Sequence, residues 1–102
     1  MSDCIFCQIG EGQIPSNKVY EDDKILCFHD LDPQAPVHVL IIPKKHITSL
    51  DDVTEEDSEL LGYIMTKVKE IAATLGLENG YSCLLYTSIH LTVIGNNDLR
   101  VL

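Results

Sequence analysis

Basic residues are scarce in this chain of 102 residues, which has 7 Lys and Arg against 16 Asp and Glu and a formal net charge of −9. Such an acidic surface repels phosphate backbones and anionic lipid headgroups. The sequence therefore argues against nucleic acid or a membrane as the main partner. A small phosphate ligand stays open, because backbone amides can bind an anion even on an acidic protein.

Long apolar runs are also missing. No stretch approaches the roughly 20 apolar residues that span a bilayer as a helix. The start of the chain, MSDCIFCQIGEG, lacks the basic residues and the long apolar segment of a secretory signal. We therefore expect a soluble, cytoplasmic protein. In that compartment cysteines are reduced or bound to metal rather than linked as disulfides, and the chain has Cys4, Cys7, Cys27 and Cys83.

The pattern of predicted elements indicates a single α+β domain, in which an antiparallel sheet carries its main helix on one face. The long helix is expected to start at an N-cap, Thr54, and to stop at Gly76, with apolar residues at steps of three and four between them. A short helix is expected at residues 2–12. Strands are predicted from β-branched residues and flanking turns at 19–22, 24–31, 37–46, 81–88 and 90–95, and Pro43 is expected to stop the third of them.

Cys4 and Cys7 form a Cys-x-x-Cys motif in the predicted N-terminal helix. Two thiolates at this spacing can bind one zinc ion from the same side, and the other ligands must then come from elsewhere. His46 is a candidate third ligand. The alternative is that the two cysteines are small buried residues and that His46 is a surface histidine. A thioredoxin-like redox pair is a weaker interpretation, because the motif does not follow a first strand.

Phe28, His29 and Asp30 stand together at the end of a predicted strand, and His38 opens the next strand. The Asp30 carboxylate can accept hydrogen bonds from two neighbouring hydroxyls, as on a ribose. Composition alone favours the alternative, in which Phe28 is core, Asp30 caps a turn and His38 is solvated. If Asp30 does bind a ribose, apolar side chains nearby would sandwich the flat base of the nucleoside. The candidates for these side chains are Phe6, Ile14, Phe28 and Leu31.

The block DLDPQAPVHVLIIPKKH, residues 30–46, closely resembles the histidine-triad (HIT) family in its bacterial and Hint-like branch. DCIFCQI and GLENGY fit the same family, so the resemblance runs from about Asp3 to Tyr81. It implies an α+β homodimer with a shared continuous sheet that binds purine nucleotides. Many such proteins hydrolyse nucleoside phosphoramidates, adenylyl conjugates or dinucleoside polyphosphates.

The resemblance also implies a role for individual residues. Asp30 would hold the ribose hydroxyls, and His38 would lie beside the catalytic histidines. Cys4, Cys7 and His46 would bind structural zinc, with the first histidine of the triad as the fourth ligand. The base and ribose pocket would be lined by Ile5, Phe6, Ile9, Ile14, Phe28, His29 and Leu31.

Catalysis in the family depends on a later segment, His-φ-His-φ-His-φ-φ with φ apolar, whose middle histidine attacks the α-phosphorus. Residues two apart on a strand point to the same face, so three imidazoles converge on one phosphate. This chain has no such triad. If Gly95 is aligned with the glycine that follows the motif, His90 takes the nucleophile position. Ser88 then replaces the first histidine and Thr92 the third, and too few residues precede Ser88 for the usual Gly-rich phosphate loop.

We therefore expect a purine nucleotide-binding member of this family with little or no turnover, and His90 and His38 are its candidate catalytic residues. The missing triad leaves open whether this chain is an enzyme at all. The second hypothesis is a non-catalytic dimerisation module that zinc stabilises through Cys4 and Cys7.

The tail from Cys83 onward is unusual in another way. The stretch CLLYTS, residues 83–88, is what a common sequencing-library adaptor encodes in one reading frame, and the resemblance ends at Ser82. We therefore predict an incomplete histidine-triad domain at residues 1–82 and an aberrant tail of foreign origin at residues 83–102. A natural paralogue that has lost its triad is the alternative.

Overall fold

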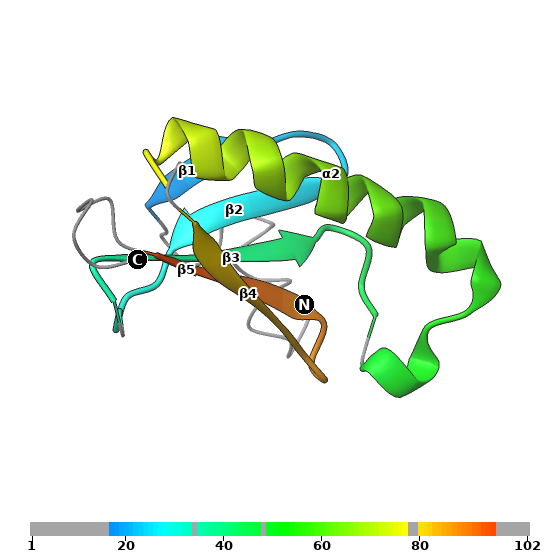
Figure 1. The fold of residues 1–102 in the computed structure, drawn as a ribbon. Coiled ribbons are helices and arrows are strands. Elements are labelled where there is room, and N and C mark those ends of the chain that lie inside the picture. The colour runs from blue at the N-terminus through cyan, green and yellow to red at the C-terminus, as the bar shows by residue number, and fades with distance from the viewer. Residues whose placement is uncertain (1–16, 34, 48, 78–79, 96–102) are drawn as a thin grey trace.

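The computed structural model describes residues 17–33, 35–47, 49–77 and 80–95. The described part is an antiparallel sheet with the strand order β1-β2-β3-β5-β4, and helix α2, Ser58–Thr74, lies across one face of it (Figure 1). This confirms the α+β prediction, whereas the short helix expected at residues 2–12 lies outside the described ranges. The strands are β1 Lys18–Glu21, β2 Ile25–His29, β3 Val37–Pro43, β4 Tyr81–Tyr86 and β5 His90–Gly95.

Strand β3 is rich in β-branched residues, which suit a pleated and buried surface. It ends at Pro43, where the sequence predicted that it stops, because a proline has no N–H to donate to the next pair of a sheet. The whole of β2 pairs with β3, from Ile25 opposite Pro43 to His29 opposite Val39. The predicted strands at 19–22 and 24–31 are confirmed, the first shifted by one residue to Lys18–Glu21 and the second shortened to Ile25–His29.

Helix α2 begins later than the N-cap prediction placed it. A 3-10 turn, Glu55–Asp57, follows Thr54, and the α-helix starts only at Ser58. Within that turn the Thr54 N–H donates to the Asp57 carboxylate at 3.0 Å, and the same buried carboxylate binds the Lys45 ammonium. These partners satisfy a charge that would otherwise be costly to bury. None of the helices among the described residues is long and apolar enough to cross a membrane.

The helix stops where the sequence predicted. Gly76 has a φ of 77°, a left-handed conformation that glycine adopts without strain. The N–H of Leu77 donates to the carbonyl of Ala72 at 3.0 Å, and the N–H of Gly76 donates to that of Ala73 at 3.2 Å. These two bonds form a Schellman motif, which satisfies the last carbonyls of the helix.

The main core lies between α2 and the sheet. Ile64, Val68 and Ile71 are buried on α2 at steps of three and four, as the periodicity predicted. They pack against alternate residues of the strands, because only every second side chain points to that face. The sheet's contribution to this core is Ile25, Cys27, Val37, Val39, Ile41, Leu91 and Val93.

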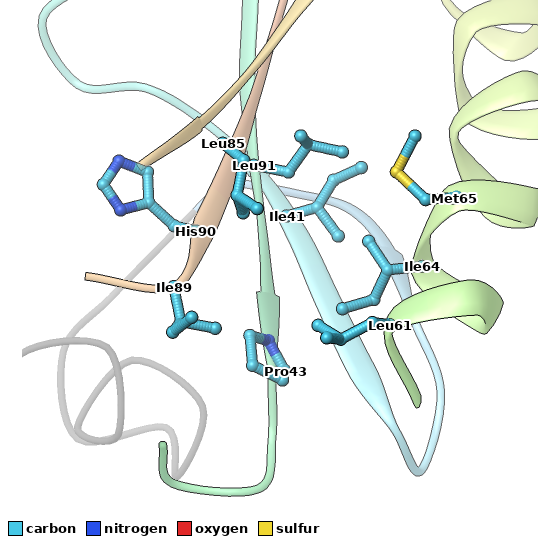
Figure 2. Close-up of a pocket in the computed structure, with 9 residues that line it drawn as sticks. All are labelled: Ile41, Pro43, Leu61, Ile64, Met65, Leu85, Ile89, His90 and Leu91. Atoms are coloured by element: carbon cyan, nitrogen blue, oxygen red, sulfur yellow. The ribbon is translucent and has the colours of Figure 1, made fainter. Parts of the chain in front are cut away.

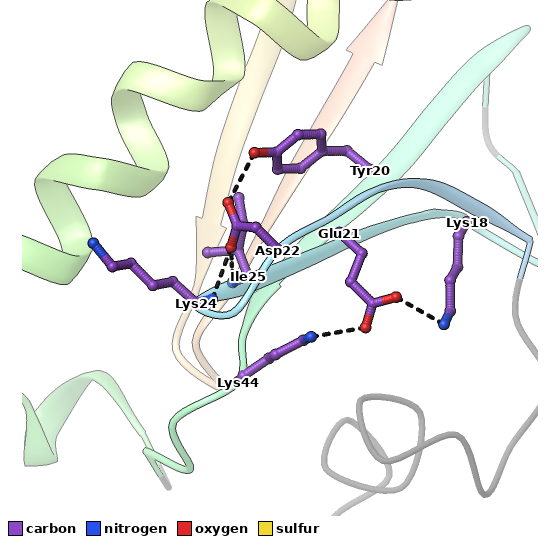
Figure 3. A network of polar contacts seen from close by, with 7 residues as sticks. All are labelled: Lys18, Tyr20, Glu21, Asp22, Lys24, Ile25 and Lys44. Carbon is purple, nitrogen blue, oxygen red and sulfur yellow. Dashed lines mark hydrogen bonds and ion pairs between the residues drawn. The ribbon is translucent and has the colours of Figure 1, made fainter.

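A polar network centred on Asp22 holds the turn between β1 and β2 (Figure 3) and is joined to α2 through Tyr63. The Asp22 carboxylate accepts hydrogen bonds from Tyr20 Oη at 2.8 Å and from the N–H groups of Lys24 and Ile25 at 2.7 and 2.9 Å. Tyr63 of α2 also donates its hydroxyl to Asp22. Burial alone raises the pKa of Asp22, but these hydrogen bonds outweigh it and hold the pKa well below its usual range. Asp22 therefore stays ionised, and its hydrogen bond from Tyr63 anchors α2 to the turn between β1 and β2.

The tail predicted at residues 83–102 supplies most of β4 and all of β5. β5 lies between β3 and β4, and its residues Leu91 and Val93 are 4% and 0% exposed. β4 is the edge strand, and all of its side chains are exposed. Residues 83–95 are therefore built into the fold, while the proposed boundary at residue 82 and the foreign origin of the tail stay predictions.

We predict that Leu91→Ala lowers the free energy of unfolding by about 3 kcal/mol, because it leaves a cavity in the core under α2. The matched control is Leu31→Ala, at a side chain that is 82% exposed. It should change stability by less than about 0.5 kcal/mol. Urea denaturation followed by circular dichroism measures both. Equal stability of the two variants would show that β5 is not part of the core.

Candidate functional site

The face of the sheet opposite α2 carries the candidate site. The strand register places His38 opposite Ile94 and Leu40 opposite Thr92, while Ile41 and Leu91 form a pair on the helix side. Side chains alternate along β5, so His90 shares the first face with Thr92. A second, small apolar cluster lies on this face and consists of Leu26, Phe28 and Ile42, with Leu40 packed against it.

Asp30 and His38 form the polar centre of this face. Asp30 Oδ2 lies 3.2 Å from His38 Nε2, and the His38 side chain is 7% exposed while that of Asp30 is 25% exposed. The backbone holds the pair together, because the Asp30 N–H donates to the His38 carbonyl at 3.0 Å. Asp30 Oδ1 also accepts the N–H of Asp32 at 2.9 Å. The carboxylate is thus fixed in orientation and still reachable from solvent, as a group that binds hydroxyls must be.

His90 is the first residue of β5 and is half-buried. Ser88 Oγ lies 3.0 Å from its Nδ1, and the Tyr86 ring stacks on the imidazole with centroids 4.5 Å apart and planes inclined by 13°. Burial lowers the pKa of His90 below its ordinary value, and the negative charge of Asp30 offsets part of that effect. The imidazole is therefore neutral at physiological pH and lies within the electrostatic reach of Asp30.

The remaining positions of the aligned motif carry no imidazole. Ser88 lies in the turn at residues 87–89 and is exposed, and Thr92 is buried with 1% exposure. This turn joins β4 to β5 directly, with Tyr86 paired opposite His90. The described hairpin therefore has no room for a phosphate loop between the two strands.

The residues predicted to line the base and ribose pocket differ in exposure and in the face of the sheet on which they lie. Phe28 is 4% exposed and belongs to the small apolar cluster, whereas Leu31 is 82% exposed. His29 lies opposite Val39, a residue that packs under α2. The pocket roles of these residues stay predictions. Ile5, Phe6, Ile9 and Ile14 lie outside the described residues.

The zinc prediction rests on residues that the structure describes only in part. His46 follows β3 and is exposed, and Cys4 and Cys7 lie outside the described ranges. Among residues 17–33, 35–47, 49–77 and 80–95, no three His, Cys, Asp or Glu side chains come close enough to hold a metal ion. A zinc site would therefore need ligands from outside these ranges, where Cys4 and Cys7 lie.

The remaining cysteines do not form an activated thiol. Burial raises the pKa of the Cys27 thiol to about 12, and the pKa of Cys83 is also raised by burial. A thiol with a raised pKa is a weak nucleophile at neutral pH. Both residues are free cysteines in the described structure.

Sequence reasoning missed the aromatic partner of His90. Tyr86 stacks on the imidazole because a tight turn pairs the two residues directly across the hairpin. The signal was available, since two short strands joined by few residues indicate a hairpin in which flanking residues face each other.

An apolar hollow of about 110 Å³ was also not predicted. It lies on the helix side of the sheet, between α2 and the start of β5 (Figure 2). In Figure 2 the imidazole of His90 points away from Ile64 and Met65, and neither Asp30 nor His38 lines the hollow. Its lining residues are Ile41, Pro43, Leu61, Ile64, Met65, Leu85, Ile89, His90 and Leu91.

Comparisons with known proteins agree on one family. A family model described as the scavenger mRNA decapping enzyme C-terminal binding region matches residues 3–92. Protein HitA of Neisseria gonorrhoeae is 47% identical over 87 residues, which are 85% of this chain and 81% of that protein. A 14 kDa zinc-binding protein of Zea mays is 39% identical over 110 residues, covering 97% of this chain and 86% of that protein.

Solved structures give the same answer. A HIT family hydrolase from Legionella pneumophila superposes with a TM-score of 0.87 at 44% identity, covering 92% of this chain and 93% of that chain. A histidine triad nucleotide-binding protein from Candida albicans superposes with a TM-score of 0.80 at 33% identity, covering 94% of this chain and 76% of that chain. The fold, the Asp30–His38 centre and these matches together show that this chain belongs to the histidine-triad family.

Proposed function

We propose that this protein binds purine nucleotides through a preserved nucleoside half of the family site and turns them over slowly or not at all. The observation that carries the proposal is the fixed carboxylate of Asp30. Its contacts with His38 and with the N–H of Asp32 hold it in one orientation while a quarter of the side chain stays exposed. A rigid carboxylate that needs no reorganisation binds the two hydroxyls of a ribose well.

The base has an apolar partner on the same face. Phe28 and Ile42 are 4% and 1% exposed and lie next to Leu40 in the small apolar cluster. Because Phe28 and Ile42 are already buried, a flat purine on this face would cover the partly exposed Leu40, and that apolar contact supports binding of the nucleoside rather than of phosphate alone. The structural similarity of this chain to a histidine triad nucleotide-binding protein from Candida albicans supports the same ligand class.

The phosphate half is reduced to one imidazole. His90 occupies the position that the resemblance assigns to the nucleophile, but Ser88 and Thr92 cannot supply the two flanking imidazoles. The direct turn from β4 to β5 also omits the amides that would stabilise charge developing on the phosphate oxygens. Losing several groups that act only in the transition state lowers kcat far more than it lowers affinity.

Isothermal titration with AMP tests the nucleoside half. Asp30→Ala should raise Kd by about tenfold or more, because it removes charge-assisted hydrogen bonds to the ribose. The matched control is Asp51→Ala, at an exposed aspartate of the 3-10 turn Leu50–Asp52, and its Kd should equal that of the wild type. Absence of AMP binding by the wild type, or equal affinities of the two variants, would contradict the proposal. So would hydrolysis of an adenosine phosphoramidate at the rate of a relative with a full triad.

A zinc-stabilised dimerisation module is the second candidate function. The edge strand β4 favours it, because its side away from β5 pairs with no strand among the described residues, and this edge and its exposed apolar side chains are a template for pairing with another strand. A zinc ion bound by Cys4, Cys7 and His46 is part of this candidate, and the zinc-binding relative from Zea mays supports it. Stoichiometric zinc without affinity for AMP would favour this function over the first.

The same strand makes a homodimer our proposal for the assembled protein. Tyr81, Leu84, Leu85 and Tyr86 of β4 are between 39% and 52% exposed, and Met65 of α2 is 58% exposed. The exposed apolar side chains of β4 lie on both faces of this edge strand, where a second strand could pair and cover them. The free thiols of Cys27 and Cys83 further suit the reducing cytoplasm as its compartment.

We predict that Leu84→Lys makes the protein monomeric at micromolar concentration, because a charged edge strand resists pairing. The control is Leu31→Lys, which places the same charge on an exposed leucine outside β4 and should leave the dimer intact. Size-exclusion chromatography with light scattering measures both masses. A monomeric wild type, or a dimeric Leu84→Lys variant, would contradict the edge-strand dimer.

A further inference from the structure

The turn that joins β4 to β5 has an isoleucine at a position that usually holds glycine. Thr87, Ser88 and Ile89 form the loop, and the N–H of Ile89 donates to the carbonyl of Tyr86 at 2.9 Å. Ile89 has a φ of 57°, in the left-handed region. Hairpin loops of three residues commonly end in such a left-handed residue, and glycine adopts it without strain. A β-branched side chain there crowds its own backbone, so this turn is strained.

Burial of the Ile89 side chain offsets this strain. The residue is 3% exposed and lines the apolar hollow between α2 and β5. Figure 2 shows it with Pro43 and Leu61 at one end of that hollow. If Ile89 left this position, its apolar surface would return to water, and that cost opposes opening of the turn. The turn therefore keeps its shape because the side chain is buried, and not because the backbone favours that shape.

The strand on one side of the turn adds little burial of its own. Leu85 and Tyr86 at the end of β4 are 52% and 45% exposed, and β4 is an edge strand. From outside the hairpin, the N–H of Leu50 donates to the carbonyl of Thr87 at 2.7 Å. Segments with few buried apolar contacts open locally at a lower free energy than the whole fold requires. Burial of Ile89 is thus the main contact that opposes local opening here.

We propose that residues 86–90 form a conformational switch whose closed state depends on Ile89. When Ile89 leaves the hollow, the turn relaxes and detaches from Leu50, while the core between α2 and the sheet stays folded. Opening also separates Tyr86 from His90, whose rings are stacked in the closed state. The position of the His90 imidazole is therefore conditional on the switch. This inference goes beyond the proposed function, because it holds whether or not the protein binds a nucleotide.

Hydrogen exchange of the full-length wild type measures the opening. The amides of Leu50 and Ile89 are the reporters, because their bonds to Thr87 and Tyr86 break together when the turn opens. Val39, which pairs with strands on both sides, reports unfolding of the sheet. The two reporters should have similar protection factors, at least about a hundredfold below that of Val39, and a weaker dependence on urea. Protection and urea dependence equal to those of Val39, or different protection of the two reporters, would overturn the proposal.

Ile89→Ala and Ile89→Gly separate burial from strain. Ile89→Ala loses the buried side chain and should lower the protection factor of Leu50 about thirtyfold. Ile89→Gly loses it as well but relieves the backbone, so Leu50 should be about fivefold better protected than in Ile89→Ala. Unchanged protection in Ile89→Ala, or poorer protection in Ile89→Gly than in Ile89→Ala, would overturn the proposal.

Lys69, an exposed residue within α2, supplies the matched control. In urea denaturation Lys69→Gly should be less stable than Lys69→Ala, as in any helix interior, whereas Ile89→Gly should be more stable than Ile89→Ala. The same order at both positions would show that residue 89 bears no strain. The wild-type exchange measurement needs no substitution, so it decides the proposal even if both Ile89 variants fail to fold.

Discussion

The pairing of β5 between β3 and β4 is the constraint on which the rest of the structure depends. Val39 lies opposite Val93 and Ile41 opposite Leu91, so these side chains meet beneath α2. Because side chains alternate along a strand, the same register turns His90 and Thr92 to the other face. A slip of one residue would reverse both faces at once and would bury the imidazole in the apolar core.

On the face thus formed, the two halves of a nucleotide site differ in completeness. The nucleoside half has a carboxylate at Asp30 that His38 and two backbone contacts hold in place, beside an apolar cluster around Phe28. The phosphate half has one neutral imidazole at His90, fixed by Ser88 and Tyr86. Binding energy and catalytic power come from different groups in such a site. A chain can therefore keep the first while it loses most of the second.

Local patterns predicted the parts of the fold that local physics determines. The β-branched run that forms β3, the apolar periodicity of α2 and its stop at Gly76 are all confirmed. The start of α2 was placed too early, because Asp57 binds Lys45 from the loop after β3 and shapes a 3-10 turn first. Asp30 and His38 were candidates on chemical grounds, but only the sheet shows their contact. The sequence pattern alone did not show the Tyr86–His90 stack, since it depends on how tightly the hairpin turns.

The register of β5 can be measured directly by nuclear Overhauser contacts between methyl groups in the folded protein. The account predicts strong contacts between Val39 and Val93 and between Ile41 and Leu91, each with further contacts to Ile64 or Val68 of α2. Contacts of Val39 with residues 92 or 94 in place of Val93, or methyl groups of Leu91 and Val93 without any contact to α2, would contradict it.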